Sequence, residues 1–325
     1  MPEHSKKTSQ DGIALLVVLW IMAILIVVVL SFSLMMRNES QAALSFKEAT
    51  EKKYLAEAAV KRAIVELFYR RVNRDQNIIL EGKEIIRVDG RAYKGYIGDG
   101  QYSFRITSEA GKININELGD DTGILLKNLL MNSGVREELA DTIVDSVLDW
   151  KDTDEFHRLH GAENDYYSSL PKPYKARNAP FETLEELLLV KGVTPKILFG
   201  SEDRIGMIFF VTLHSKTNKI DIGAAPKEVL MAIPGVPAEA AERIIEYRNT
   251  AEIRETENMR QIIGADIYAL LEPYLGAAEA DTYSIDALGF RDDVRKGFSV
   301  RTTVILEGAT NYRYLYYKSP AEKTL

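Results

Sequence analysis

The chain has 325 residues, of which 46% are hydrophobic and 27% charged, enough for two ordinary domains beside any membrane segment. Its formal net charge of -7 indicates no general affinity for nucleic acids or anionic lipids. The absence of cysteine excludes disulfides, thiolate metal sites and cysteine nucleophiles.

The first predicted element is an apolar segment at residues 13–36, whose only polar side chains are two serines. About 20 such residues in a helix span the hydrocarbon core of a bilayer, and no other run approaches this length, so we expect a single span. Lys6 and Lys7 precede the segment. Because basic residues stay in the cytoplasm, we expect a cytoplasmic leader and export of everything after Arg37.

Gly12 stands directly before the apolar segment, and no Ala-x-Ala site follows the segment. A secretory signal usually has an apolar region of about 7–15 residues that ends in small residues, so it fits poorly. The arrangement resembles a type IV prepilin leader, in which a dedicated peptidase cuts after the glycine. That resemblance implies a cut between Gly12 and Ile13 and methylation of the new amino terminus. On this segment alone, an uncleaved signal anchor fits equally well.

Two residues depart from the prepilin pattern. Asp11 stands where prepilins usually carry a basic residue, and Val17 is the fifth residue after the expected cut, where most pilin-like subunits have Glu. In that family the Glu is thought to pair with the amino terminus of the next subunit. A subunit with Val17 cannot make this pair, which suits a subunit that has no neighbour above it.

The helix is expected to continue beyond the membrane, because residues 37–73 contain no Gly or Pro and their apolar residues recur every three or four positions. One rod from residue 13 to about residue 72 would be roughly 90 Å long. A rod half in the membrane and half packed on a head is the pilin shape. A juxtamembrane helical stalk would use the same residues.

Strand patterns frame the rest of the chain. Residues 92–111 alternate Tyr and Ile with small or polar residues around a turn at 98–101, and strand character returns at 282–290, 298–308 and 311–319. The region between is mostly helical. We therefore predict an α+β fold in which a pilin-like long helix and small antiparallel sheet carry a large inserted α-helical domain. The expected boundaries are a leader at 1–12, a membrane part of the helix at 13–36, a further helical part at 37–72, a β head formed by 73–110 and 276–325, and the insertion at 111–275.

The expected insertion contains an internal repeat, in which a helix, a glycine hairpin and a second helix occur twice, with Gly134 aligned on Gly235, and a shorter version contains Gly192. The pattern resembles the helix-hairpin-helix motif, which often holds DNA phosphates, so a membrane-anchored DNA receptor is the alternative function. Residues 111–275 contain 18 Lys and Arg against 28 Asp and Glu. Phosphate contacts need a basic surface, so we expect no nucleic acid partner.

Six acidic residues lie between Asp149 and Asp165, in a stretch that leads into Pro-containing sequence. Closely spaced carboxylates in a loop need solvent or a cation between them, and oxygen clusters suit Ca²⁺. The spacing is not that of an EF-hand, so a solvated acidic surface stays open. A zinc site would use His157, His160 and Glu163, although Gly161 and the loop context weigh against their sharing a helical face.

Five stretches together resemble the minor pseudopilin K family of type II secretion systems (GspK). They are "GIALLVVLW" with Val17, "EAGKININ" at 109–116, "LADTIVDSVLDWKDTD" at 139–154, the long "GAENDYY" to "LLLVKGV" stretch at 161–193, and "KIDIGAAPKEVLMAIPGV" at 219–236.

The resemblance implies a single-pass inner-membrane protein with a periplasmic head. Such a protein would cap the tip of the pseudopilus and help start its assembly with other minor pseudopilins. It also implies bound calcium, for which Asp149, Asp152, Asp154, Glu163 and Asp165 are the candidate ligands. The other implied partners are the prepilin peptidase, the inner-membrane secretion machinery and exported proteins that meet the tip. The sequence shows no nucleophile elbow, phosphate loop or zinc-protease motif, so we expect no enzymatic activity.

Overall fold

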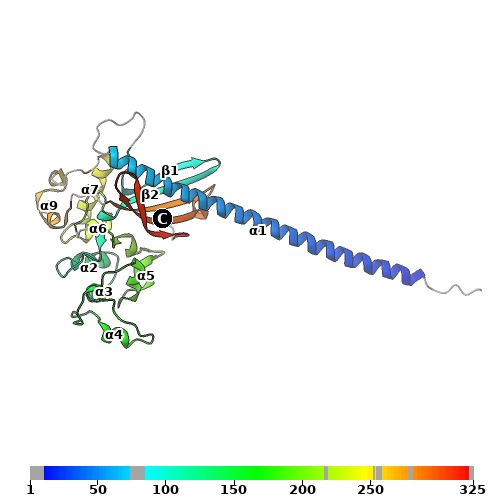
Figure 1. The fold of residues 1–325 in the computed structure, drawn as a ribbon, viewed down its shortest axis with the longest axis horizontal. Helices are drawn as coiled ribbons and strands as arrows, with labels where there is room; N and C mark the ends of the chain where they lie inside the picture. Colours follow the sequence, from blue (N-terminus) through cyan, green and yellow to red (C-terminus); the bar gives the residue numbers. More distant parts are fainter. Residues whose placement is uncertain are drawn as a thin grey trace, which may run out of the picture.

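The computed structural model describes residues 11–73, 85–215, 219–251, 253, 258–276 and 281–321. Residues 1–10 of the expected leader lie outside this part of the chain. The described residues form a long helix, an antiparallel sheet and a helical region, which confirms the predicted pilin-like α+β fold (Figure 1).

Helix α1 (Asp11–Asn73) is continuous from the apolar segment into the head (Figure 1). Residues 13–73 contain no Gly or Pro, so nothing interrupts the backbone hydrogen bonds of the helix. At 63 residues it is about 95 Å long. The prediction of one rod is confirmed. Its second half also carries ion pairs one turn apart: Lys47–Glu51, Glu48–Lys52, Lys53–Glu57 and Arg62–Glu66.

The main sheet has five antiparallel strands in the order β1-β2-β7-β8-β9. All the strand patterns read from the sequence are confirmed. The turn between the first two strands contains Gly98, whose φ of 56° lies in the left-handed region that glycine adopts readily. The strands are β1 (Asp89–Ile97), β2 (Gly100–Ser108), β7 (Thr282–Phe290), β8 (Phe298–Glu307) and β9 (Asn311–Lys318).

Helix α1 packs on one face of this sheet, against β2, β7 and β8. The helix presents small residues there, because Ala56, Ala59 and Ala63 are fully buried. The facing strand residue, Gly289, has no side chain, and an added Cβ would lie 2.1 Å from the Lys52 carbonyl oxygen. Helix and sheet therefore approach almost to backbone contact and share one hydrophobic core.

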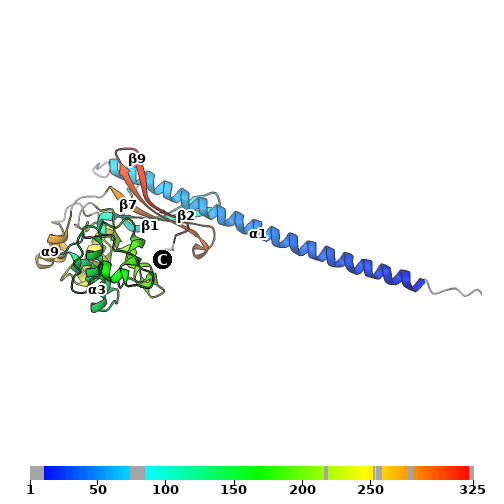
Figure 2. The same ribbon diagram turned by 60° about the horizontal axis from the view of Figure 1, so that its bottom comes forward.

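The helical region leaves the sheet after β2 and returns at β7, which are neighbouring strands. It has its own hydrophobic core and lies on the side of the sheet away from α1 (Figure 2). Its helices are α2 (Gly123–Asn132), α3 (Glu137–Lys151), α4 (Asn164–Ser168), α5 (Pro195–Phe199), α6 (Lys227–Ala232), α7 (Ala238–Thr250), α8 (Met259–Ile263) and α9 (Ala265–Leu271). Short 3₁₀ helices include η1 (Glu109–Gly111), η2 (Leu184–Leu189) and η3 (Met207–Phe209). Two small strand pairs complete the region: β3 (Ile113–Asn114) with β6 (Val211–Thr212), and β4 (Gly200–Ser201) with β5 (Arg204–Ile205).

The internal repeat is visible in this region. The pairs α2–α3 and α6–α7 each turn at a glycine with positive φ, 84° at Gly134 and 77° at Gly235, and Gly192 has the same geometry. The residue after each of the two glycines is buried, and Ile143 and Ile244 are both fully buried. The two copies pack on each other through α2 and α6. The hairpins therefore serve the core of the helical region.

Replacing Gly289 by Ala tests the close approach of α1 to the sheet. The added methyl group meets helix backbone, which cannot rotate away, so we expect a loss of about 1–3 kcal/mol in the free energy of unfolding of the head. Gly119→Ala is the matched control, because among the described residues no atom beyond its two chain neighbours lies within 4 Å of its Cβ position. Thermal unfolding of the detergent-solubilised chain gives the comparison, and equal melting temperatures for both variants would refute the packing account.

Candidate metal site and amino-terminal helix

The acidic cluster forms where α3 ends. Asp149 lies in the last turn of α3, Asp152 is its C-cap residue with extended backbone, and the chain then runs as a loop to Glu163, the N-cap residue of α4. Aromatic packing anchors both ends of the loop, because the Trp150 and Tyr167 rings lie edge to face with centroids 5.1 Å apart. The loop therefore closes on itself and returns Glu163 to the end of α3.

Asp149 is fully buried and organises the loop. Its carboxylate accepts hydrogen bonds from the Ala162 amide at 2.9 Å, the Arg158 amide at 3.1 Å and the Arg158 guanidinium at 2.7 Å. Gly161 passes directly over it, and a Cβ there would lie 1.8 Å from the Asp149 Oδ2 atom. A side chain at this position would collide with the carboxylate, which explains why glycine stands in the loop.

Asp149, Asp152 and Glu163 each offer a carboxylate oxygen, and these oxygens lie within 4.8 Å of one another. Glu163 is only 2% exposed. Neither of its oxygens, nor Asp152 Oδ1, has a hydrogen-bond partner in the described part of the chain. Burial, followed by the charges of Asp149 and Asp152, raises the pKa of Glu163 to about 7. Buried acceptors without donors are rare, so these oxygens are candidate ligands for a cation.

Asn178 is a fourth candidate that sequence reasoning missed. Its Oδ1 atom is buried and also lacks a partner among the described residues, while its side-chain nitrogen donates to the Asp154 carbonyl at 3.2 Å. Its backbone amide donates to the Trp150 carbonyl at 3.0 Å, which holds it beside the end of α3. Its φ of 49° is left-handed, a conformation that Asn tolerates better than most residues. An Asn in Pro-containing sequence gives only a turn signal, so its role could not be predicted.

Two of the five predicted ligands lie apart from this group. Asp154 is exposed and accepts a hydrogen bond from the Phe156 amide, whereas Asp165 is exposed and accepts one from the Tyr166 amide. The alternative histidine pair does not gather with Glu163 either. His157 and His160 are both exposed in the loop, and the His160 ring contacts Asp145 at 3.2 Å.

The donor set is suited to a hard cation. Every candidate atom is an oxygen, from three carboxylates and one amide, which are the ligands that Ca²⁺ prefers. Arg158 brings one positive charge and already contacts Asp149, Asp152 and Asp120. One guanidinium cannot neutralise these carboxylates and Glu163 as well, so the residues present fit a bound divalent cation.

The residues singled out around the expected cut lie on α1, whereas Lys6 and Lys7 lie outside the described residues. Residue 12 is within the helix, Ile13 begins its continuously exposed part, and the Val17 side chain is 50% exposed. The apolar part of α1 is long and apolar enough to cross a membrane by length and composition, and none of it is buried in the chain itself. Its exposed apolar surface is therefore expected to be covered by lipid or by other helices.

The hairpins offer little to a nucleic acid. Helix α3 begins with Glu137 and Glu138, and the first turn of α7 contains Glu239. Carboxylates at helix amino termini occupy the positions where phosphates would bind. The local charges agree with the overall acidity of the region.

The raised pKa of Glu163 predicts a pH dependence in the presence of a chelator. The folded state binds this proton more tightly than the unfolded state, so stability falls as pH rises from about 4.5 to about 7. Glu163→Gln removes this contribution, and the melting temperature of the variant relative to the native chain should rise across the same interval. Asp165→Asn is the control, since Asp165 is exposed. Parallel pH profiles for the native chain and Glu163→Gln would contradict the assignment.

The comparisons with known proteins agree with this architecture. A family model described as type II secretion system protein K matches residues 111–199. A putative type II secretion system protein K of Escherichia coli K12 is 28% identical over 58% of this chain and 59% of its own length. The corresponding protein of Pectobacterium carotovorum is 32% identical over 33% of each chain. The alignments thus span less than two thirds of these relatives.

A solved structure shares the fold. A chain in the crystal structure of the GspK-GspI-GspJ complex of enterotoxigenic Escherichia coli matches with a TM-score of 0.61 at 14% identity, covering 87% of this chain and all of that chain. The family model, the named relatives and the shared fold therefore confirm the resemblance of this chain to the type II secretion system protein K family.

Proposed function

We propose that this chain is a minor pseudopilin of a type II protein secretion system, which caps the tip of the periplasmic pseudopilus and helps to start its assembly. The observation that carries the proposal is α1, one uninterrupted helix whose first part is fully exposed and apolar and whose second part is built into the head. This is the construction expected of a subunit that leaves the membrane by joining a helical filament. The matches to protein K relatives support it.

Two features favour the tip position. Val17 lacks the carboxylate that would pair with the amino terminus of a subunit above it. The helical region also has its own core and lies on the side of the sheet away from α1 (Figure 2). At the tip, the helical region would not have to fit between stacked subunits.

Other minor pseudopilins are the proposed partners, because the structural neighbour was solved as the GspK-GspI-GspJ complex. Exposed apolar side chains on α1, such as Leu44, Phe46 and Tyr54, offer them a helical surface. Docking there would bury these side chains and offset the cost of drawing apolar helix out of the bilayer. The prepilin peptidase, the inner-membrane secretion machinery and exported proteins at the tip are the further proposed partners.

Calcium is the proposed cation of the acidic cluster. Asp149, Asp152, Glu163 and Asn178 would hold it, and its charge would neutralise the carboxylates that Arg158 leaves uncompensated. The cation would fix the loop between α3 and α4. Its role would be structural, since no described group in the cluster is placed as a nucleophile.

Processing is the first test of the proposal. Coexpression with a prepilin peptidase should shorten the chain to a methylated amino terminus at Ile13, as measured by intact mass and amino-terminal sequencing. Gly12→Ile should block the cut, because the side chain obstructs the peptidase, whereas Asp11→Lys should leave it intact. An unchanged amino terminus in the presence of the peptidase would contradict the proposal and indicate that the apolar segment is an uncleaved signal anchor.

Val17→Glu tests the tip position. A subunit with nothing above it gains no partner from the new carboxylate and loses none, so pseudopilus assembly and secretion should stay within about twofold of the native level. Ile24→Glu is the control, because a charge in the middle of the span costs about 2.5–3.5 kcal/mol and should impair insertion. Assembly that collapses with Val17→Glu would contradict the tip assignment.

Calcium binding can be measured directly by titrating CaCl₂ into chelator-treated protein. Because neither Glu163 oxygen has a hydrogen-bond partner among the residues that the structure describes, we expect Glu163→Gln to weaken binding at least tenfold and Asn178→Ala to weaken it less. Asp165→Asn should bind like the native chain. Equal affinity in the native chain and Glu163→Gln would place the cation elsewhere.

A further inference from the structure

The face of the main sheet that points away from α1 is polar. Along β2, β7 and β8 the side chains alternate, so that residues such as Phe104, Ile106 and Ile285 are buried under α1. The alternate residues face the helical region instead: Arg105, Thr107, Ser284, Asp286, Arg301 and Thr303. The two hydrophobic cores are consequently separate, and the seam between sheet and helical region has no continuous apolar filling.

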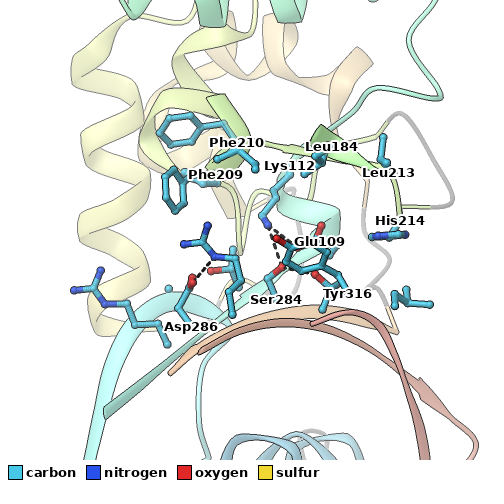
Figure 3. Close-up of a pocket in the computed structure, with 18 of the residues that line it drawn as sticks. Glu109, Lys112, Leu184, Phe209, Phe210, Leu213, His214, Ser284, Asp286 and Tyr316 are labelled. Atoms are coloured by element: carbon cyan, nitrogen blue, oxygen red, sulfur yellow. Dashed lines mark hydrogen bonds and ion pairs between the residues drawn. The ribbon is translucent and has the colours of Figure 1, made fainter. Parts of the chain in front are cut away.

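A cavity of about 300 Å³ lies in this seam (Figure 3). The sheet forms one wall, and the other carries apolar residues of the helical region, among them Leu184, Phe209 and Leu213. Ile205 also lines the cavity and is 58% exposed, so the apolar wall reaches solvent. The volume is at the lower end of the range for ligand pockets.

Polar contacts hold the two walls together. The Arg301 guanidinium lies 4.3 Å from the centroid of the Phe209 ring and also pairs with Asp286 at 2.6 Å. On the other side, the Tyr316 hydroxyl donates to a Glu185 oxygen at 3.0 Å. Between them Lys112 pairs with Glu109 at 2.5 Å and donates to Ser284 at 3.4 Å. These contacts fix the width of the cavity without filling it.

The charges that line the cavity are mostly negative. Six carboxylates line it against three Lys and Arg side chains. Four of the six are in ion pairs: Asp89 with Arg91, Glu109 with Lys112, Glu182 with Arg177, and Asp286 with Arg301. Glu185 accepts from a neutral hydroxyl, and Glu228 has no ion pair within the described residues. Glu185 and Glu228 are therefore the two lining carboxylates without an ion pair among the described residues, and Arg105 is a further cation in the lining.

We propose that this cavity binds an extended segment of a partner protein that carries an apolar side chain flanked by basic residues. The apolar side chain would lie against Phe209 and Leu213, and a Lys or Arg would lie near Glu185 and Glu228. Charge complementarity determines this choice, because the six lining carboxylates outnumber the three lining Lys and Arg side chains, and an acidic segment would lie near Glu185 and Glu228. The proposal does not depend on pseudopilus assembly, since the site lies wholly within one chain.

The test uses the full chain in phosphatidylcholine nanodiscs and a fluorescein-labelled acetyl-Lys-Gly-Phe-Gly-Lys-amide peptide, with fluorescence anisotropy as the readout and empty nanodiscs as the blank. Saturable binding is expected. Peptides with Ala for Phe or Glu for both Lys residues should bind at least tenfold more weakly. No saturable binding, or equal binding of the acidic peptide, would overturn the proposal.

Two variants locate the bound peptide. Glu228→Lys should weaken binding at least fivefold, with Glu246→Lys as the control because Glu246 is exposed on α7 away from the cavity. Leu213→Trp should block binding by filling the cavity, with Val294→Trp as the control on an exposed turn. Should Leu213→Trp fail to fold, Glu228→Lys alone decides the outcome. Unchanged affinity in Glu228→Lys would overturn the site.

Discussion

The close packing of α1 on the sheet is the contact on which the rest of the structure depends. Ala59 and Ala63 on the helix and Gly289 on β7 let two backbones approach where larger residues would hold them apart. This contact joins the head to a helix whose other half is exposed and apolar. A displacement of that helix along its axis would therefore move the head with it, as a filament subunit requires.

The same packing determines where the helical region can lie. With one face of the sheet covered by α1, the region inserted between β2 and β7 occupies the other side, and the adjacency of these strands lets it enter and leave without disturbing the ladder. Because that second face is polar, the two parts meet through Arg301, Lys112 and Tyr316 instead of a shared core. The cavity follows from this division, since polar walls held by long side chains do not close completely.

The acidic loop likewise combines a carboxylate that is held by hydrogen bonds with one whose negative charge is not compensated. Asp149 is fixed by backbone amides and by the absence of a side chain at Gly161, whereas Glu163 is buried beside it and has no donor within the described part of the chain. A cation would convert this destabilising charge into a contact that joins α3 to α4.

The sequence predicted the long helix and the strands because each depends on local pattern: residues 13–73 contain no helix breaker, and the strands alternate. The glycine hairpins were equally predictable, since Gly134 and Gly235 adopt the backbone that only glycine adopts freely. Within the acidic loop, the sequence predicted that carboxylates would be the ligands but not which of them come together. The loop has no helical or strand periodicity that fixes the direction of its side chains. The sequence therefore could not distinguish Asp154 and Asp165 from Glu163, and it could not identify Asn178 as a further candidate ligand. The cavity depends on strands from distant parts of the chain, and no sequence pattern encodes it.

The tip position is the central claim, and imaging the assembled pseudopilus tests it most directly. Cryo-electron microscopy of purified pseudopili, with a small rigid tag fused after residue 325, should show one tagged density at a single end of each filament. Tagged density repeated along the filament would make the chain an ordinary repeating subunit. Filaments that form normally without it would contradict a role in starting assembly.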